Sequence, residues 1–327
     1  MTDTILKAEN LAKHFSLTSF FTLGGGNAQV LKAVDGVDFS IARGETFGLV
    51  GESGSGKSTT ARLITRLIDA TSGRIEFNGE NILEMPKAAF KGLRRRIQMV
   101  FQDPYTSLNP RMRLRDALGN PLRLHNIVPR AEVDDRVVEL LELVGLQADH
   151  RHRYPHEFSG GQRQRLSIAR AMALEPDLII ADEAVSALDV SVRAQILNLF
   201  GRLRDDRNLT YLFIAHDLSV VEHFCDRVAV MYGGKIVEVG PVEELFADPR
   251  HPYTQALISA IPEPDPTREY RPQVLEGEMV NLIDRPAGCV FCGRCPVAEA
   301  ICRNEEPALK TSEDGRQVAC YMHREAG

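Results

Sequence analysis

The chain has 327 residues and a net charge of -6, with 43% hydrophobic and 26% charged residues. This composition excludes a disordered chain, and the acidic total excludes a general electrostatic attraction to nucleic acid. No stretch reaches the roughly 20 apolar residues that cross a bilayer, and residues 1–10 lack the pattern of a secretory signal. We therefore expect an intracellular protein that meets a membrane only through a partner.

The first part of the chain predicts strands on either side of a glycine-rich segment. Residues 34–41 and 46–50 are apolar-rich and favour strands, and the second run leads directly into the glycines that start at Gly51. The next expected elements are a helix over residues 57–67, a hairpin over 71–79 and a strand over 96–101.

Residues 103 to about 175 have the periodicity of helices rather than strands. Val133, Val137 and Leu140 recur at the spacing of one helical face, and residues 161–173 predict a further helix. We expect this stretch to be a helical subdomain inserted into an α/β core.

The α/β pattern then resumes and ends in a compositional change. Expected elements are a strand over 178–181, a helix over 192–203, a strand over 211–215 and a hairpin over 227–239. Alternating strands and helices predict a mainly parallel sheet covered on both faces. Pro262, Pro264 and Pro266 form a stiff connector between a main domain, residues 1–260, and a cysteine-rich tail, residues 261–327.

One motif predicts a phosphate site between a strand and a helix. Gly51-Glu-Ser-Gly-Ser-Gly-Lys57-Ser58 fits GxxxxGK[ST], in which backbone N–H groups and a helix N-terminus surround a phosphate. Lys57 would reach the β- and γ-phosphates, and Ser58 would bind Mg²⁺. The strand before and the helix after disfavour a chance glycine-rich turn. The nucleotide-binding residues assigned here are Gly51, Glu52, Ser53, Gly54, Ser55, Gly56, Lys57, Ser58 and Thr59.

Two further motifs suit the same chemistry. An apolar strand ends in Asp182 and Glu183, which places Asp182 to hold Mg²⁺ and Glu183 to polarise the attacking water. Ser159-Gly160-Gly161-Gln162 opens a helix and exposes N–H groups to an anion. By itself this last pattern favours an ordinary capped helix.

In this order the three motifs resemble the ABC ATPase family, with Ser159, Gly160, Gly161 and Gln162 matching its signature. The resemblance implies a P-loop NTPase (RecA-like) core with an antiparallel β subdomain, and it implies hydrolysis of ATP to ADP and phosphate. It also implies that two ATPase subunits enclose the nucleotide, so that the signature of one chain contacts the ATP bound by the other.

The same resemblance implies roles for isolated residues. Gln102 matches the Q-loop, which senses the γ-phosphate, takes part in Mg²⁺ binding and couples to membrane subunits. Asp189 matches the D-loop, and His216 matches the switch histidine. Phe15, ahead of the first expected strand and of an insertion over residues 16–29, is the aromatic residue expected to stack on adenine.

A narrower resemblance concerns residues 101–110, 251–257 and 288–291, which are similar to the oligopeptide/dipeptide/nickel importer branch. Residues 31–36 resemble the second of its two paired ATPase subunits. The branch implies a paralogous ATPase subunit, two transmembrane permeases and an extracytoplasmic solute-binding protein. The chain would lie peripherally at the cytoplasmic face of the inner membrane. The implied cargo is a di- or oligopeptide, with nickel or another small solute as the alternative.

Five cysteines of the tail predict metal ligation in a reducing compartment. They are Cys289, Cys292, Cys295, Cys302 and Cys320. The branch resemblance implies a 4Fe-4S cluster on all of them except Cys292, whereas the CxxCxxC spacing resembles ferredoxins and includes Cys292. Zinc and a tail of free thiols are the alternatives. We expect the connector to separate this tail from the phosphate site, so that ATPase activity survives a cysteine substitution better than cluster content does.

Two other classes are disfavoured. A soluble ABC ATPase acting on DNA or ribosomes often has two cores or a long heptad run, and neither is present in this acidic chain. A non-hydrolysing regulatory subunit is disfavoured by Glu183 and His216. Phe158 and Ala184, where the family commonly has Leu and Pro, are not expected to prevent hydrolysis.

Overall fold

The structure is a computed structural model that describes residues 3–17, 29–103, 108–262 and 272–323. The first of its two compact units comprises Met1–Ala42, Thr46–Glu84 and Ala215–Gly327, and the second comprises Arg43–Glu45 and Met85–Ile214. The glycine-rich segment and the cysteine tail therefore share one unit. The expected domain boundary at residue 260 does not coincide with these units and stays a prediction.

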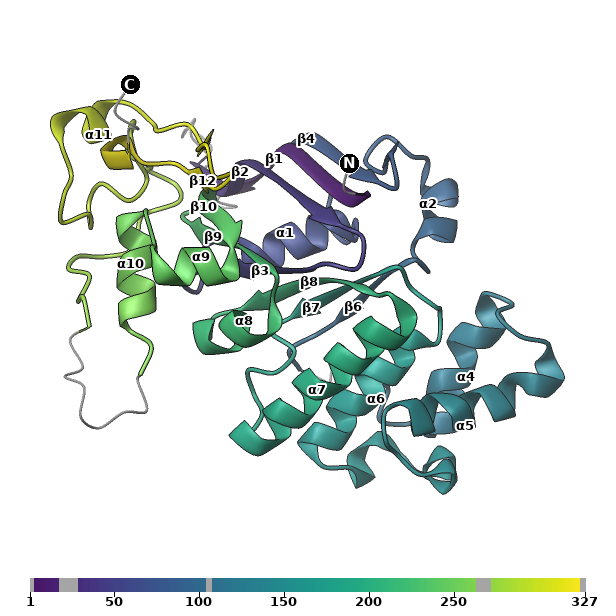
Figure 1. Cartoon of the computed structure of the whole chain (residues 1–327). Helices are drawn as coiled ribbons and strands as arrows, with labels where there is room; N and C mark the ends of the chain where they lie inside the picture. The colour runs from purple at the N-terminus through teal and green to yellow at the C-terminus, as the bar shows by residue number, and fades with distance from the viewer. Residues whose placement is uncertain (1–2, 18–28, 104–107, 263–271, 324–327) are drawn as a thin grey trace. The chain divides into compact units, whose positions relative to one another are not determined.

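The first unit contains the predicted antiparallel β subdomain. Strand β1 (Thr4–Leu17) lies between β2 (Gln29–Ala42) and β4 (Ser72–Phe77), and β4 turns back into β5 (Glu80–Asn81) (Figure 1). The predicted first strand began at Val34, so β1 was missed. Register shifts interrupt the pairing of β1 with β2, and for that reason its apolar residues do not alternate with a clean period of two.

A second set of strands in this unit includes the tail. Strand β3 (Thr46–Val50) runs parallel to β9 (Arg227–Tyr232), which pairs antiparallel with β10 (Lys235–Pro241). Tail strand β12 (Gln317–Val318) pairs with β10, and β11 (Lys310–Thr311) pairs with β12. The tail is thus continuous with the sheet whose strand β3 leads into the glycine-rich segment.

The helices described in the first unit are short. They are α1 (Lys57–Ile64), α8 (Leu218–Phe224), α9 (Val242–Ala247), α10 (Pro252–Ser259) and α11 (Ala300–Asn304), followed by the 3-10 turn η4 (Tyr321–His323). Helix α1 is the predicted helix after the glycines, and it ends earlier than expected because Arg66 adopts a left-handed backbone with φ 48°.

The second unit confirms the predicted parallel sheet. Its strands follow the order β8 (Thr210–Ala215), β7 (Leu178–Asp182) and β6 (Ile97–Val100), all parallel. Every residue of β7 and β8 is buried, as expected for parallel strands covered on both faces.

Helices also form the predicted helical stretch, residues 103 to about 175. They are α4 (Leu114–Leu124), α5 (Val133–Leu143) and α6 (Gly160–Met172), with 3-10 turns η1 (Arg130–Glu132), η2 (Ala148–His152) and η3 (Pro155–Glu157). Outside this stretch, the second unit also has α2 (Lys87–Leu93) and α7 (Val190–Arg207). Helix α5 buries Val133, Val137 and Leu140, which confirms the predicted apolar face. It packs against α4, and α6 packs against α7 (Figure 1).

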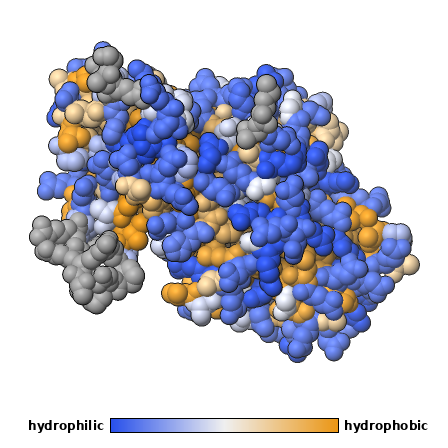
Figure 2. All heavy atoms as spheres, viewed as in Figure 1, coloured by the Kyte–Doolittle hydropathy of each residue, from blue (hydrophilic) through white to orange (hydrophobic). Residues whose placement is uncertain are grey.

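Some predicted features lie outside the described residues. These are residues 104–107 of the 101–110 motif, Pro264 and Pro266 of the connector, and residues 18–28 of the insertion after Phe15. Within the part of the chain that the structure describes, no helix is both long and apolar enough to cross a membrane. The face in Figure 2 is covered mostly by hydrophilic side chains, in keeping with the composition.

Candidate functional site

The P-loop, residues 51–58, connects β3 to α1 and requires glycine at both ends. Gly51 has φ 148° and Gly56 has φ 109°, backbone conformations that other residues rarely adopt. A Cβ atom on Gly51 would lie 2.0 Å from the Met231 carbonyl oxygen, and one on Gly56 would lie 2.4 Å from the Ala33 carbonyl oxygen. Neither backbone oxygen can move freely, so the tight path of this loop depends on the two glycines.

Lys57 is the first residue of α1, and its side chain turns back into the P-loop. The ammonium group donates hydrogen bonds to the carbonyl oxygens of Gly51 and Glu52, at 2.7 Å and 2.8 Å. It also lies 3.4 Å from the Ser55 hydroxyl oxygen. Lys57 is only 4% exposed. A buried cation inside a loop of backbone amides, at the N-terminus of a helix, is an arrangement that can bind phosphate.

The other residues of this segment differ in exposure. Ser53 and Gly54 are exposed at the tip of the loop, Ser55 is buried, and Ser58 and Thr59 are half-buried on α1. A phosphate can therefore approach from the side of Ser53 and Gly54 and meet the first turn of α1.

Two contacts to the P-loop come from outside the motif, and the sequence did not predict them. The Glu52 backbone N–H donates to the Tyr253 hydroxyl oxygen at 2.8 Å. Arg294 of the tail donates two hydrogen bonds to the Glu52 carboxylate, at 2.8 Å and 3.2 Å. The expectation that the connector separates the tail from the phosphate site is therefore wrong. Neither contact has a signal in local spacing, because the partners lie about 200 residues or more apart.

The carboxylate pair lies at the end of β7 in the second unit. Asp182 is 8% exposed. Glu183 adopts a left-handed backbone with φ 49°, held by its N–H to the Ile214 carbonyl oxygen at 3.0 Å. A non-glycine residue in this conformation costs of order 1–3 kcal/mol, and such strain clusters at functional sites. The two carboxylates thus leave the sheet in a fixed and locally strained turn.

The signature segment begins α6, and Ser159 caps this helix as predicted. The Gln162 N–H donates to the Ser159 hydroxyl oxygen at 3.4 Å, and the Ser159 N–H donates to the Gln162 side-chain oxygen at 3.1 Å. This reciprocal pair is a capping box. Ser159 and Gly160 are exposed, while Gly161 and Gln162 are half-buried. The helix start is therefore presented at a surface.

The remaining candidates lie at the ends of elements. Gln102 is exposed just after β6, and Asp189 is the exposed residue that precedes α7. His216 is exposed directly after β8. Phe15 lies inside β1 rather than ahead of the first strand, which corrects its expected place. Its ring is 36% exposed, with the Lys13 ammonium 4.9 Å from the ring centroid.

The candidates thus divide between the two units. The P-loop, Phe15 and His216 belong to the first unit, and the remaining ATP-site candidates belong to the second. Within the second unit, β7 supplies Asp182, α6 supplies the signature, and the chain after β6 supplies Gln102. This last segment is connected to α6 by a hydrogen bond of 3.4 Å from the Gln164 side-chain amide to the Phe101 carbonyl oxygen.

Comparisons with known proteins identify the family. Residues 34–186 match the ABC transporter family, and residues 237–302 match the oligopeptide/dipeptide transporter C-terminal region. A probable peptide ABC transporter ATP-binding protein of Sinorhizobium fredii is 51% identical over 100% of this chain and 92% of its own. The chain belongs to the ABC transporter ATP-binding proteins. An oligopeptide transport ATP-binding protein of Bacillus subtilis is 49% identical over 98% of each chain.

Solved structures agree with this family. A dimeric ATP-binding cassette in a post-hydrolysis state, bound to ADP and Pi, has a TM-score of 0.64 and 26% identity, covering 73% of this chain and 99% of that one. A component of a Clostridium perfringens ABC transporter complex has a TM-score of 0.64 and 28% identity, covering 75% and 92%. The predicted P-loop NTPase fold and the predicted ATPase activity are confirmed.

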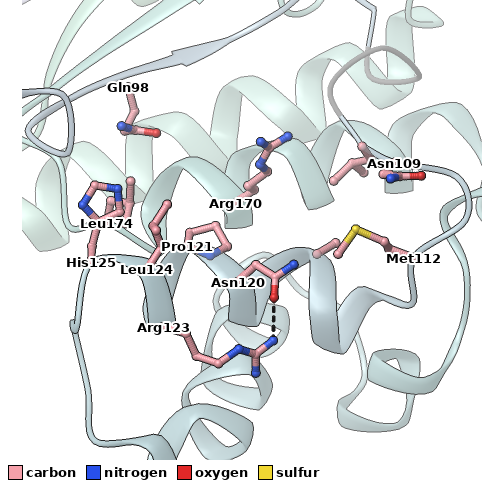
Figure 3. Close-up of a pocket in the computed structure, with 12 residues that line it drawn as sticks. Gln98, Asn109, Met112, Asn120, Pro121, Arg123, Leu124, His125, Arg170 and Leu174 are labelled. Carbon is pink, nitrogen blue, oxygen red and sulfur yellow. Dashed lines mark hydrogen bonds between the residues drawn. The ribbon is translucent and has the colours of Figure 1, made fainter. Parts of the chain in front are cut away.

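The second unit of this ABC ATPase has a cavity of about 650 Å³ (Figure 3). Its walls come from β6, α4, α6 and the residues just before α4. The lining residues are Gln98, Leu108, Asn109, Met112, Ala117, Asn120, Pro121, Arg123, Leu124, His125, Arg170 and Leu174. The Arg123 guanidinium donates to the Asn120 side-chain oxygen at 2.7 Å. Leu124 is 70% exposed, so an apolar side chain borders the opening.

The cysteines of the ABC ATPase tail lie close together as thiols. The Cys289 N–H donates to the Cys302 carbonyl oxygen at 2.8 Å. Burial is the main cause that raises the pKa of Cys289 to about 12, and the neighbouring Cys292, Cys302 and Cys320 contribute to this rise. Burial also raises the pKa of Cys295 and of Cys320. Among the residues described, no group of three or more His, Cys, Asp or Glu side chains is arranged to hold a metal ion. The described residues therefore give no support to the predicted iron–sulfur or zinc site.

Proposed function

We propose that this ABC ATPase energises the import of di- or oligopeptides through separate membrane permeases. The match of residues 237–302 to the oligopeptide/dipeptide transporter C-terminal region supports this proposal. The curated relatives named above, called peptide and oligopeptide transporter proteins, support the same cargo. The similarity over the whole chain favours transport over an action on DNA or ribosomes. The chain then lies at the cytoplasmic face of the inner membrane, and an extracytoplasmic protein delivers the peptide.

The geometry of the P-loop is the observation that carries the ATP-site assignment. A cation buried among backbone amides suits the β- and γ-phosphates, which assigns Lys57 to them. The other assigned roles are Mg²⁺ binding by Ser58, Gln102 and Asp182, activation of water by Glu183, γ-phosphate contact by His216 and adenine stacking by Phe15. These groups bind and orient ATP and Mg²⁺, and Glu183 accepts the proton of the attacking water.

A second ATPase subunit, a paralogue of this chain, completes the proposed arrangement. Ser159 and Gly160 are exposed at the N-terminus of a helix of 13 residues, where backbone N–H groups favour an anion. They suit the triphosphate bound by the partner subunit, with Gly161, Gln162 and Asp189 beside them. Each hydrolytic site would then combine the P-loop of one chain with the signature of the other.

The permease contact is proposed for the cavity in Figure 3. Its cationic lining residues Arg123 and Arg170, with the exposed Leu124, suit a short permease segment that presents an acidic and an apolar side chain. Leu124→Asp should lower peptide transport without weakening ATP binding by the chain. Leu67→Asp, which alters an exposed leucine outside the cavity, is the matched control. Equal transport by both variants would remove the cavity from this role.

Glu183→Gln tests the proposed hydrolytic mechanism. The amide keeps the shape of the side chain and cannot accept a proton, so ATP should still bind while turnover falls by at least about 100-fold. The variant should accumulate an ATP-bound dimer. Turnover is measured in the assembled transporter, and a wild-type rate there would exclude Glu183 as the group that activates water.

For the cysteine tail, the 4Fe-4S cluster stays a prediction. Metal analysis of anaerobically purified protein for iron, acid-labile sulfide and zinc is the direct test. If the cluster is bound by the four tail cysteines other than Cys292, Cys295→Ser should destroy it and Cys292→Ser should retain it. If the ligands follow the ferredoxin-like spacing, which includes Cys292, both substitutions should destroy the cluster. Protein without any of these metals would leave a tail of free thiols.

A further inference from the structure

One loop of the tail, residues 289–295 and here called the tail loop, contacts the P-loop. Its Arg294 donates from Nη1 to Glu52 Oε2 at 2.8 Å and from Nη2 to Glu52 Oε1 at 3.2 Å. The Arg294 side chain is 10% exposed and the Glu52 side chain 24% exposed. A bidentate pair of this kind, largely withdrawn from water, fixes both the position and the direction of the carboxylate.

Glu52 is held at its main chain as well as its side chain. Its backbone N–H donates to the hydroxyl oxygen of Tyr253 in α10 at 2.8 Å. Its carbonyl oxygen accepts a hydrogen bond from the Lys57 ammonium at 2.8 Å. The peptide units around Glu52 therefore connect the outside supports to the cation assigned to phosphate. If Glu52 moved, the acceptors that orient Lys57 would move with it.

The tail loop is itself anchored in a rigid aromatic cluster. Phe291 is 1% exposed, and its ring centroid lies 5.1 Å from that of Tyr232 and 5.4 Å from that of Tyr253. The Arg294 guanidinium lies 5.9 Å from the centroid of the Tyr232 ring. Aromatic packing of this kind restricts the loop, so Arg294 reaches Glu52 from a fixed base.

Charge gives the contact a second consequence. Glu52 places a carboxylate in a loop assigned to a polyanion, and repulsion between like charges is strong at short range in a partly buried site. Arg294 neutralises this carboxylate through its two hydrogen bonds to Glu52. Removing Arg294 would leave the carboxylate uncompensated beside the phosphates, in addition to freeing the loop.

We propose that Arg294 is a positioning residue for ATP, acting through Glu52 to set the P-loop main chain and to cancel its negative charge. The inference rests on the proposed role of the P-loop as the ATP site. It makes the C-terminal region a support of the nucleotide site rather than a separate appendage.

Titration of the full-length chain with Mg-ATP, together with steady-state kinetics, tests this role. Arg294→Ala should raise Kd and KM for ATP about tenfold and change kcat little, since the altered group does not touch the reacting atoms. Arg294→Lys keeps the charge and should recover part of the affinity. The double variant Glu52→Gln with Arg294→Ala should bind ATP better than Arg294→Ala alone, because the uncompensated carboxylate is gone.

Arg316→Ala is the matched control for a purely structural effect. Arg316 is 6% exposed in the same tail and pairs with Asp248 and Asp314, neither of which belongs to the P-loop. It should lower the melting temperature and leave KM for ATP unchanged. Wild-type affinity in Arg294→Ala, an equal rise of KM in Arg316→Ala, or no recovery in the double variant would each overturn the proposal.

Lys57→Ala separates this proposal from the one on which it rests. If Lys57→Ala binds ATP normally, the assignment of the P-loop itself fails. If Lys57→Ala loses ATP while Arg294→Ala binds normally, the P-loop assignment stands and the role of Arg294 fails. If Arg294→Ala does not fold, Arg294→Lys and Glu52→Gln are compared with the wild type in ATP affinity instead, because they change the side chains less.

Discussion

The P-loop and the signature segment are both glycine-containing turns that open a helix, and they are held in different ways. The signature segment is stabilised by a capping box between residues three apart, Ser159 and Gln162. The P-loop is supported at Glu52 by residues 201 and 242 positions downstream, Tyr253 and Arg294. One turn that suits an anion is thus formed by local chemistry, whereas the other depends on the fold around it.

This difference has a physical origin. A capping box supplies side-chain acceptors for N–H groups at a helix start that have no partner within the helix. It needs no other part of the chain. The P-loop places its glycines and Glu52 against β9, α10 and the tail, so its conformation includes long-range contacts. Changes in the tail should therefore alter the P-loop and leave the signature segment intact.

The largest expected effect is the loss of nucleotide binding in Lys57→Ala. Removing the cation that faces the phosphates should raise Kd for ATP on the order of 100-fold. Isothermal titration at matched Mg²⁺ and salt measures this change. Ser159→Ala is the control from the other turn and should bind ATP with wild-type affinity in the isolated chain, because Ser159 is assigned to the partner's nucleotide and not to the P-loop of its own chain. Equal affinity in Lys57→Ala and wild type would end the phosphate assignment.

A smaller effect is expected when the signature segment is blocked in one of two chains. Ser159→Arg places a long side chain where the partner's γ-phosphate would approach, and the P-loop of the same chain should still bind ATP. In a mixed dimer, hydrolysis should be lost at the site that contains the partner's P-loop, which leaves about half of the turnover if the two sites contribute equally. Loss confined to the site with the mutant's own P-loop would contradict the arrangement across chains.

Acid should weaken the tertiary support of the P-loop by destabilising the fold around His251. Near neutral pH this is the smallest of the expected effects. His251 caps α10, its Nδ1 accepting the Tyr253 N–H at 3.1 Å. Complete burial lowers the pKa of His251 to about 3, with a contribution from His323. The unfolded chain, with a histidine pKa of about 6.5, binds this proton while the native state does not, so stability falls as pH drops from about 6.5 toward 3.

The expected loss from this group is ~2 kcal/mol at pH 5. Thermal unfolding at pH 7 and pH 5 measures the change, and His251→Asn, which keeps a capping acceptor and cannot titrate, is the control. Asp248 and Asp314 have lowered pKa values, so these two carboxylates also favour the native state at higher pH. A pH profile of His251→Asn identical to that of wild type would exclude His251 as a source of acid sensitivity.

Several features could be predicted because neighbouring residues determine them. The glycines of the P-loop, the cap at Ser159 and the buried face of α5 each depend on residues a few positions apart. The parallel strands of the second unit were predicted for a similar reason, since strands covered on both faces are continuous apolar runs. These patterns predicted whether a segment forms a helix or a strand. The predicted boundaries of these elements differ from those in the structure by a few residues.

Other features depended on contacts that no local pattern contains. Strand β1 was missed because its register shifts break the alternation of apolar residues. The tail strands β11 and β12 are two residues each, too short to have a periodicity, and they exist because β10 offers an edge.

The sequence by itself determined the family, the ATP chemistry and the local geometry of each motif, since these depend on residue types at short, regular spacings. Only the tertiary structure decided that the tail contacts the P-loop. The contact between Arg294 and Glu52 requires the chain to return to the P-loop after 242 positions. Chain connectivity places no constraint on such a distant pair, so its formation depends on the packing of the sheet, α10 and the aromatic cluster.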